Sequence, residues 1–204
     1  MKTGIICVTT ISVLLYLILG TVSSSFSIQE QNPTLLYGSG SYPRRYESVK
    51  DLASSKEVDV VVHGIILTRQ SYLKTSLDGY GQLISTKYSF KVTRVLKGDI
   101  TKDMINVHQT GGTLGDKTLI MTEDPPMNVG DELILFLHHF TSKETYPDDY
   151  YVEGGPQGRF IVDGSNVYGL ADLYRTPDVL RMAGHLKTNG LSLSTFFDQI
   201  TQSK

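Results

Sequence analysis

The sequence predicts a mainly β domain followed by helices near the C-terminus. Short apolar or alternating segments recur at intervals of roughly 10 to 20 residues between Val58 and Val167, without helical segments between them. This spacing is typical of an antiparallel sheet or barrel. After residue 176, apolar residues at spacings of three and four favour two short helices. The chain of 204 residues is long enough for one such domain plus terminal extensions.

The N-terminal segment predicts export. Residues 1–25 contain one charge, Lys2, then an uncharged apolar run over residues 4–20 and small residues that suit a signal peptidase. At about 17 residues the run is short for a membrane-spanning helix, which needs roughly 20. Two outcomes remain open, secretion after cleavage near residues 23–25 or an uncleaved anchor formed by residues 4–22. In both cases we expect an extracytoplasmic protein, which contacts a membrane only if the leader is not cleaved.

A polar segment and a short helix are predicted ahead of the sheet. Residues 26–45 mix Gln, Asn, Ser, Gly and Pro with little apolar periodicity, which predicts a flexible linker. The helix is expected within residues 48–59, because the Ser48 side chain can accept from the free N–H groups of a first turn. Its apolar face consists of Val49, Leu52 and Ala53. The β domain is assigned to residues 46–175.

The strands are predicted from β-branched and alternating segments. Residues 58–68 are almost continuously apolar, which is typical of a strand buried on both faces, and Gly64 indicates a bulge or bend. Residues 86–98 alternate until Arg94, where the phase slips as it does at a bulge. Further strands are predicted over residues 103–110, 117–121 and 131–140 and around Tyr151, Phe160 and Val167.

Residues 176–204 are predicted to form a helical extension. The sequence Thr-Pro-Asp at residues 176–178 marks a helix start, because proline is tolerated at the first position and an acid suits the positive end. Asn-Gly at residues 189–190 ends this helix, and Ser192 opens a second one. The two apolar stripes are Val179, Met182, Ala183 and Leu186, and Leu193, Phe196, Phe197 and Ile200. Both stripes are expected to pack against the domain.

Three motifs together resemble the netrin-like domains, a family that includes the tissue inhibitors of metalloproteinases. They are VDVVVHGIIL, YSFKVTRVLKGD and VGDELILFLHH, and the likeness in order and spacing covers about residues 48–140. The resemblance implies an OB-like five-stranded antiparallel Greek-key barrel, here with an extra C-terminal hairpin and two short C-terminal helices. It also implies an exported protein-binding module. We expect a cysteine-free member of prokaryotic type.

The predicted domain lacks cysteine, which separates it from the metalloproteinase inhibitors. Cys7 in the leader is the only cysteine of the chain, so the domain has none for disulfides, thiolate metal sites or a cysteine nucleophile. In those inhibitors an N-terminal cysteine chelates the zinc of the protease. The resemblance therefore does not imply protease inhibition for this chain.

The sequence contains no recognisable catalytic, metal or cofactor motif. His138 and His139 are adjacent on a predicted strand and so point to opposite faces, and no HExxH spacing exists. No G-x-S-x-G motif exists, and the net charge of −2 gives no basis for binding nucleic acid. The acidic pairs are interpreted as solvated loop acids; they are Glu123 and Asp124, and Asp148 and Asp149. A hydrolase with dispersed acids and a structural envelope component remain alternatives to a binding module.

The sequence GGPQGRF at residues 154–160 lies between two strand-like segments. This context predicts a turn and not a phosphate cradle, which needs a helix after the glycines. The turn residues are Gly154, Gly155, Pro156 and Gly158, where the glycines supply positive φ or a bulge. The candidate binding residues beside the turn are Tyr150, Tyr151, Gln157 and Arg159. We expect them to bind a protein or glycan at the cell surface, without a cofactor.

Overall fold

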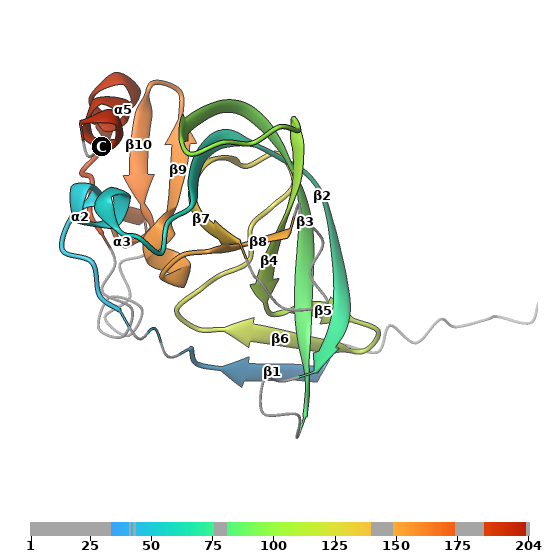
Figure 1. Cartoon of the computed structure of the whole chain (residues 1–204). Coiled ribbons are helices and arrows are strands. Elements are labelled where there is room, and N and C mark those ends of the chain that lie inside the picture. Colours follow the sequence, from blue (N-terminus) through green and yellow to red (C-terminus); the bar gives the residue numbers. More distant parts are fainter. Residues whose placement is uncertain are drawn as a thin grey trace, which may run out of the picture. The chain divides into compact units, whose positions relative to one another are not determined.

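The computed structural model describes residues 34–40, 42, 44–75, 81–139, 149–173 and 186–202. Strands account for most of these residues, which confirms the prediction of a mainly β domain (Figure 1). The predicted leader and the predicted helix that starts at residues 176–178 lie outside the described residues. None of the helices among the described residues is long and apolar enough to cross a membrane.

The strands and helices have the following bounds. The strands are β1 (Thr34–Gly38), β2 (Val60–Thr75), β3 (Gln82–Lys97), β4 (Met104–Thr110), β5 (Gly112–Leu114), β6 (Lys117–Met121), β7 (Glu132–His139), β8 (Asp149–Val152), β9 (Arg159–Asp163), β10 (Asn166–Gly169) and β11 (Leu191–Ser192). The helices are α2 (Val49–Ser54), the 3-10 helix η1 (Gly155–Gly158), α3 (Leu170–Leu173) and α5 (Leu193–Thr201).

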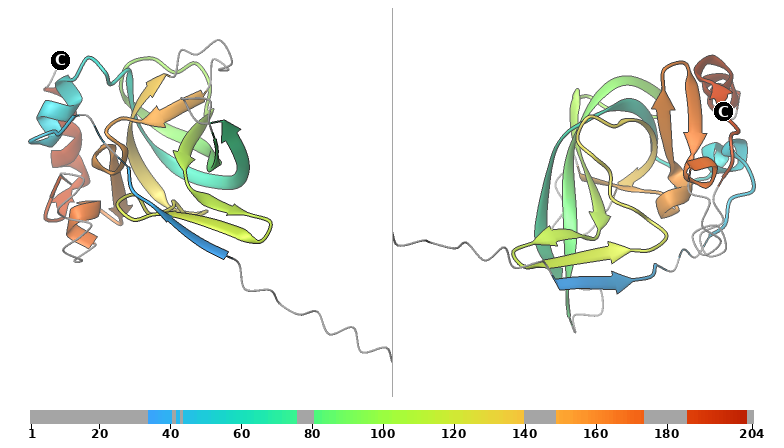
Figure 2. Two further views of the ribbon diagram at one scale, coloured as in Figure 1. Left: turned by 90° about the horizontal axis from the view of Figure 1, so that it is seen from below. Right: turned by 180° about the vertical axis from the view of Figure 1, so that it is seen from behind.

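The strands form two sheets. The larger sheet has the order β11-β10-β9-β7-β2-β3-β4-β8, and the smaller one has the order β1-β6-β5. In the larger sheet β8 also pairs with β7, so that β7, β2, β3, β4 and β8 pair around a closed ring (Figures 1 and 2). The antiparallel hairpin of β9 and β10 extends the sheet beyond β7, because β9 pairs with the edge of β7 that faces away from β2.

The larger sheet is mixed, whereas the sequence predicts antiparallel pairing. β4 and β8 run in parallel, with Val107 opposite Tyr150 and His108 opposite Tyr151. The other pairings of the ring are antiparallel. The apolar pattern of a strand shows which faces are buried but not the direction of its neighbour, so this parallel pairing could not be predicted.

The predicted irregularities of the long hairpin β2–β3 are present. The register shifts between His63 and Gly64 on β2, and at the same place the partners on β3 change from Arg94 to Val92. A further shift lies between Val61 and Val62. These bulges bend the two 16-residue strands, which lets them take part in the ring.

β7 lies between two hydrophobic cores. Leu133, Leu135 and Leu137 belong to the core that β7 shares with β2, β3, β4 and β8, whereas Ile134 and Phe136 belong to the core beneath the helices. In the second core the Phe136 ring lies 5.5 Å from Phe160. The continuous apolar sequence of β7 follows from this burial on both faces.

The helices α2 and α5 begin where the sequence predicts. The side chain of Ser48 accepts from Asp51 N at 3.0 Å, and the side chain of Ser192 accepts from Thr195 N at 3.2 Å. The predicted apolar faces are buried in the core beneath the helices; they comprise Val49, Leu52 and Ala53 of α2 and Phe196, Phe197 and Ile200 of α5. The N-caps and packing together fix both helices.

The predicted linker contains a strand. Within residues 26–45, residues 34–38 form β1, which pairs in parallel with β6. The large side chains of β1 stay exposed, and Tyr37 retains 70% of its accessible surface. β1 is therefore held by backbone pairing with a strand about 80 residues away and not by an apolar face, which leaves no periodic signal in its own sequence.

Candidate functional site

The candidate site is a cavity of about 450 Å³ that is lined by parts of the ring, by the 154–155 turn and by the segment before α2. We call it the Arg159 cavity. The lining residues that matter for its chemistry are Tyr42, Lys74, His108, Asp124, Glu153 and Arg159. Tyr151 and His138 also line it, and they link these groups.

Tyr151 forms the centre of an aromatic row that crosses three neighbouring strands. On β8 it lies opposite His108 of β4 and opposite His138 of β7. Its ring stacks on both imidazoles, with centroid distances of 5.4 Å to His108 and 5.9 Å to His138. Because a histidine stacks on each side, Tyr151 positions its neighbours and does not offer a free ring face to a ligand.

Lys74 on β2 contacts Tyr151, the central residue of this aromatic row. Its Nζ donates to Tyr151 Oη at 2.6 Å and lies 4.6 Å from the centroid of the Tyr151 ring. Burial lowers the pKa of Lys74. The pKa of Tyr151 is raised, first by burial and then by the charge of Asp149. The pair thus places a cation beside a neutral phenol at the cavity wall.

His108 has a protein neighbour at each ring nitrogen. Its Nδ1 shares a hydrogen bond with Tyr72 Oη at 2.8 Å, and its Nε2 lies 3.4 Å from Asp149 Oδ1. The same Asp149 oxygen accepts from Asn106 Nδ2 at 2.9 Å. Burial lowers the pKa of His108 and outweighs the opposing effect of Asp149. His108 is therefore neutral at neutral pH.

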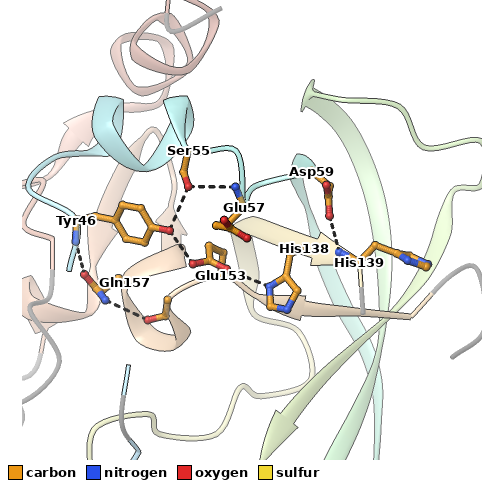
Figure 3. Close-up of polar contacts among 9 residues, drawn as sticks. Tyr46, Ser55, Glu57, Asp59, His138, His139, Glu153 and Gln157 are labelled. Carbon is orange, nitrogen blue, oxygen red and sulfur yellow. Dashed lines mark hydrogen bonds and ion pairs between the residues drawn. The ribbon is translucent and has the colours of Figure 1, made fainter. Parts of the chain in front are cut away.

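Glu153 connects the cavity to the segment before α2 (Figure 3). Its Oε1 accepts from Tyr46 Oη at 2.6 Å, and its Oε2 lies 3.2 Å from His138 Nδ1. Burial alone would raise the pKa of Glu153, but the contacts with His138 and Tyr46 outweigh it and lower that pKa. Burial and the bond to Glu153 raise the pKa of Tyr46 to about 12. Glu153 is thus an ionised acceptor.

Arg159, the first residue of β9, is buried with unsatisfied donors. Its side chain is 4% exposed, and its Nη2 lies 3.4 Å from Asp124 Oδ1. Within the part of the chain that the structure describes, neither Nε nor Nη1 has a hydrogen-bond partner. His108 Nε2 and His138 Nδ1 in the same lining also lack a hydrogen bond, but each lies within 3.4 Å of a carboxylate. Buried charged groups normally have full hydrogen bonding, so the guanidinium, with two unsatisfied nitrogens, is a polar feature of the cavity that the fold alone leaves unexplained.

The four predicted binding residues do not form one exposed surface. Tyr151 and Arg159 line the cavity. Tyr150 belongs to the core inside the sheet, as expected for the neighbour of Tyr151 on a strand. Gln157 is only 1% exposed, and it binds the backbone of residues 44–46 by accepting from Tyr46 N at 2.9 Å and donating to Arg44 O at 3.0 Å.

The 154–158 turn forms part of the cavity wall. Gly154 and Gly155 have positive φ angles of 63° and 56°. Pro156 is buried in the first turn of η1. Gly158 has no positive φ, but a Cβ there would lie 2.3 Å from Glu153 O. A Cβ on Gly155 would lie 2.1 Å from the ring of Tyr42, so this ring packs directly on the turn.

Of the acids that the sequence suggests to be solvated, Glu123 and Asp149 are buried and Asp124 is partly buried. Glu123 is 1% exposed and its Oε1 accepts from Gly40 N at 3.1 Å. Asp124 lines the cavity, and Asp149 is buried beside His108. Asp148 lies outside the described residues. The local sequence places these acids in loops, and only long-range contacts bury them.

Other site residues could not be found from the sequence. Lys74, His108 and Asp124 lie in separate strands and loops, and no motif connects them. Asp124 is fixed through its backbone, because Gln109 Nε2 donates to Asp124 O at 3.0 Å. Pro125 and Pro126 after it mark a rigid turn, which is the one local signal of an ordered loop here.

The described residues contain no group of three or more histidine, aspartate or glutamate side chains that could hold a metal ion. His138 and His139 point to opposite faces, since His138 stacks on Tyr151 and His139 meets Tyr150 edge to face. This arrangement is the one that strand alternation requires.

Comparison with known proteins does not assign the chain to a family. The sequence matches no protein-family model, and a search of curated proteins found no match.

Proposed function

We propose that this protein is an exported, non-enzymatic binding module of the OB-like, netrin-like type whose ligand occupies the Arg159 cavity. The order of pairing supports the OB-like assignment. β2, β3 and β4 are consecutive antiparallel strands, and β7 returns by a long connection to pair with β2. That order is a Greek key, and β8 closes the ring between β4 and β7.

The size of the Arg159 cavity carries the proposal of ligand binding. Its volume of about 450 Å³ lies within the range of roughly 300 to 1,000 Å³ that small-molecule sites occupy. Of the two expected partner classes, a glycan fits better than a protein. A concave site of this size admits one or two sugar rings, whereas a protein partner usually needs a broad surface of roughly 800 Å².

The protonation states of the cavity favour binding over hydrolysis. Acid–base hydrolysis uses two carboxyl groups with well separated pKa values, one of them raised. The pKa of Glu153 is lowered by its contacts, so this carboxyl does not serve as a proton donor at neutral pH. Asp124 lies beside the Arg159 guanidinium. Both acids thus act as fixed charges that orient other groups.

A panel of immobilised neutral and acidic glycans tests the proposed binding. We expect the purified protein to be retained by a subset of these glycans. Leu83→Trp, a change in the cavity lining, is expected to weaken retention at least about tenfold, because the indole fills the space for the ligand. Leu73→Trp is the matched control, since Leu73 has a similar exposure of 52% against 44% but lies outside the lining. No retention by any glycan, or equal loss in both variants, contradicts the proposal.

A hydrolase is the second candidate, and one contact favours it. His108 lies 3.4 Å from Asp149, an arrangement that general bases use. His108 Nδ1 already shares a hydrogen bond with Tyr72, however, and His108 Nε2 is a buried atom beside Asp149, so neither nitrogen is exposed to a substrate. Turnover of a glycoside or ester panel by the purified protein that Asp149→Asn abolishes would establish the hydrolase instead.

Export is supported by the leader sequence at residues 1–25. Mass spectrometry of the mature N-terminus checks it. A new N-terminus near residues 23–25 in the extracytoplasmic fraction is expected for secretion, and an intact Met1 in the membrane fraction is expected for an anchor. An intact chain in the cytoplasmic fraction contradicts both.

A further inference from the structure

We propose that Arg159 binds a carboxylate group of the ligand, which makes the ligand an acidic sugar or another small carboxylic acid. This inference rests on the proposed function, because it concerns the same cavity. It names the chemical class of the ligand, which the size of the cavity does not give.

Arg159 lines the cavity and has hydrogen-bond donors without acceptors. A guanidinium carries five N–H groups, one on Nε and two on each terminal nitrogen. Nε and Nη1 have no acceptor among the described residues, so three of the five N–H groups lack a partner. The side chain is 4% exposed and lines the cavity, and we infer that a ligand in the cavity supplies the acceptors that these buried donors lack. An oxyanion is the natural acceptor for buried guanidinium donors.

The position of Asp124 shows that Arg159 is oriented but not saturated. Gln109 holds the backbone of this loop, because its Nε2 donates to Asp124 O and to Pro125 O, each at 3.0 Å. Gln109 is itself fixed by Tyr88, whose Oη donates to Gln109 Oε1 at 3.0 Å. The Asp124 carboxylate therefore stays 3.4 Å from Nη2, a long contact that leaves the remaining donors available.

The charges of the lining favour an anion with a single negative charge. Among the described residues, three cationic side chains line the cavity, Arg44, Lys74 and Arg159, and two carboxylates oppose them, Asp124 and Glu153. The excess is one positive charge when all five groups are ionised. A carboxylate balances that charge, whereas a phosphate carries nearly two charges at neutral pH.

Calorimetric titration with matched probes tests the proposal on the purified protein. The probes are sodium D-glucuronate and D-glucose, which share a ring and differ in the carboxylate, together with sodium acetate and inorganic phosphate. We expect D-glucuronate to bind at least about tenfold more tightly than D-glucose, since a charge-assisted hydrogen bond contributes at least that factor. The melting temperature should rise with D-glucuronate and not with D-glucose.

Two variants assign the effect to Arg159. Arg159→Lys keeps the charge but loses the planar donors, and we expect D-glucuronate binding to fall about tenfold or more while circular dichroism stays unchanged. Asp124→Asn removes the competing carboxylate and is expected to tighten D-glucuronate binding. If Arg159→Lys does not fold, the ratio of the two sugars in the unchanged protein and the Asp124→Asn result decide the question.

The possible outcomes separate this inference from the proposed function. Equal binding of D-glucuronate and D-glucose overturns the inference and leaves a neutral-sugar module in place. Tighter binding of inorganic phosphate than of D-glucuronate also overturns it. Binding of acetate as tight as that of D-glucuronate supports it and assigns a free small acid in place of an acidic sugar. No binding of any probe overturns it, whereas the proposed function fails only if the glycan panel also retains nothing.

Discussion

Gly155 lies in the cavity wall, where its backbone packs against the Tyr42 ring. Its φ of 56° disfavours any other residue, and an added Cβ would lie 2.1 Å from the Tyr42 ring. We expect Gly155→Ala to lower the free energy of unfolding by at least about 2 kcal/mol, from backbone strain together with displacement of this ring. Urea denaturation measures the loss.

Gly164 provides a matched control for that substitution. Its φ of 58° is nearly the same, but no atom lies within 4 Å of an added Cβ. Gly164→Ala is therefore expected to cost only the backbone term, about 1 to 2 kcal/mol. Equal losses for the two variants would mean that the Tyr42 ring does not pack on the turn in solution.

Because of Glu153, the free energy of unfolding is expected to fall at acidic pH. Its contacts with His138 and Tyr46 lower its pKa below the ordinary value of 4.5. The unfolded chain therefore binds the proton more readily than the folded chain, and the contribution of Glu153 to stability is complete above that ordinary value. It is lost as the pH falls from there through the lowered pKa of the folded state.

Urea denaturation between about pH 3 and 6 tests this dependence. We expect Glu153→Gln to be less stable than the unchanged protein at pH 6 and to lose less stability on acidification. Glu57→Gln is the control, because the exposed Glu57 has no side-chain partner of this kind and should leave the acid dependence unaltered. Parallel acid profiles for the unchanged protein and Glu153→Gln would contradict the assignment.

The helix α5 depends on its N-cap residue, Ser192. Ser192 accepts from Thr195 N at 3.2 Å, and the helix buries Phe196 and Phe197 against the sheet. We expect Ser192→Ala to destabilise the protein by about 1 kcal/mol, since a backbone donor of the first turn then lacks its acceptor. Asp198→Ala, at an exposed position of the same helix, is expected to be near neutral. A loss in both variants equal in size would show that the cap does not set the start of α5, and thermal denaturation distinguishes the cases.

Elements with their own apolar pattern were predictable, and elements held by partners were not. β7 is predicted because Leu133 to Leu137 are buried on alternate faces, which gives a continuous apolar run. β1 was missed because its Leu35, Leu36 and Tyr37 remain exposed and its stabilisation comes from pairing with β6. The sequence of a strand indicates whether its own side chains are buried. It does not indicate which strand an exposed strand pairs with.

The residues of the candidate site were likewise only partly predictable from the sequence. Tyr151 and Arg159 were both named from the sequence because they flank a glycine turn, and both line the cavity. Tyr150 was named with them although alternation along β8 sends it into the core. Lys74 and His108 reach Tyr151 only because β2, β4 and β8 meet in the folded ring, and this proximity depends on topology.

The molecule combines a ring of strands with a flanking sheet and helices, and β7 connects the two parts. On one edge β7 pairs with β2, and on the other edge it pairs with β9 of the flanking hairpin near its start and with β8 of the ring at its end. Its alternating side chains enter both cores. A loss of packing at β7 is therefore transmitted to the helices and to the cavity together, which favours a single cooperative unfolding transition.

The closure of the ring by β8 predicts slow hydrogen exchange of the backbone amides in this strand. β8 pairs with β4 on one edge and with β7 on the other, whereas β1 pairs with β6 alone and exposes most of its side chains. Hydrogen exchange of backbone amides should therefore be slow at Tyr150 and Tyr151, which open only when the ring opens, and fast along the outer edge of β1. NMR-detected exchange in deuterated buffer measures both strands in one sample. Exchange of β8 as fast as that of β1 would mean that the ring is open in solution, and the OB-like assignment would then lose its support.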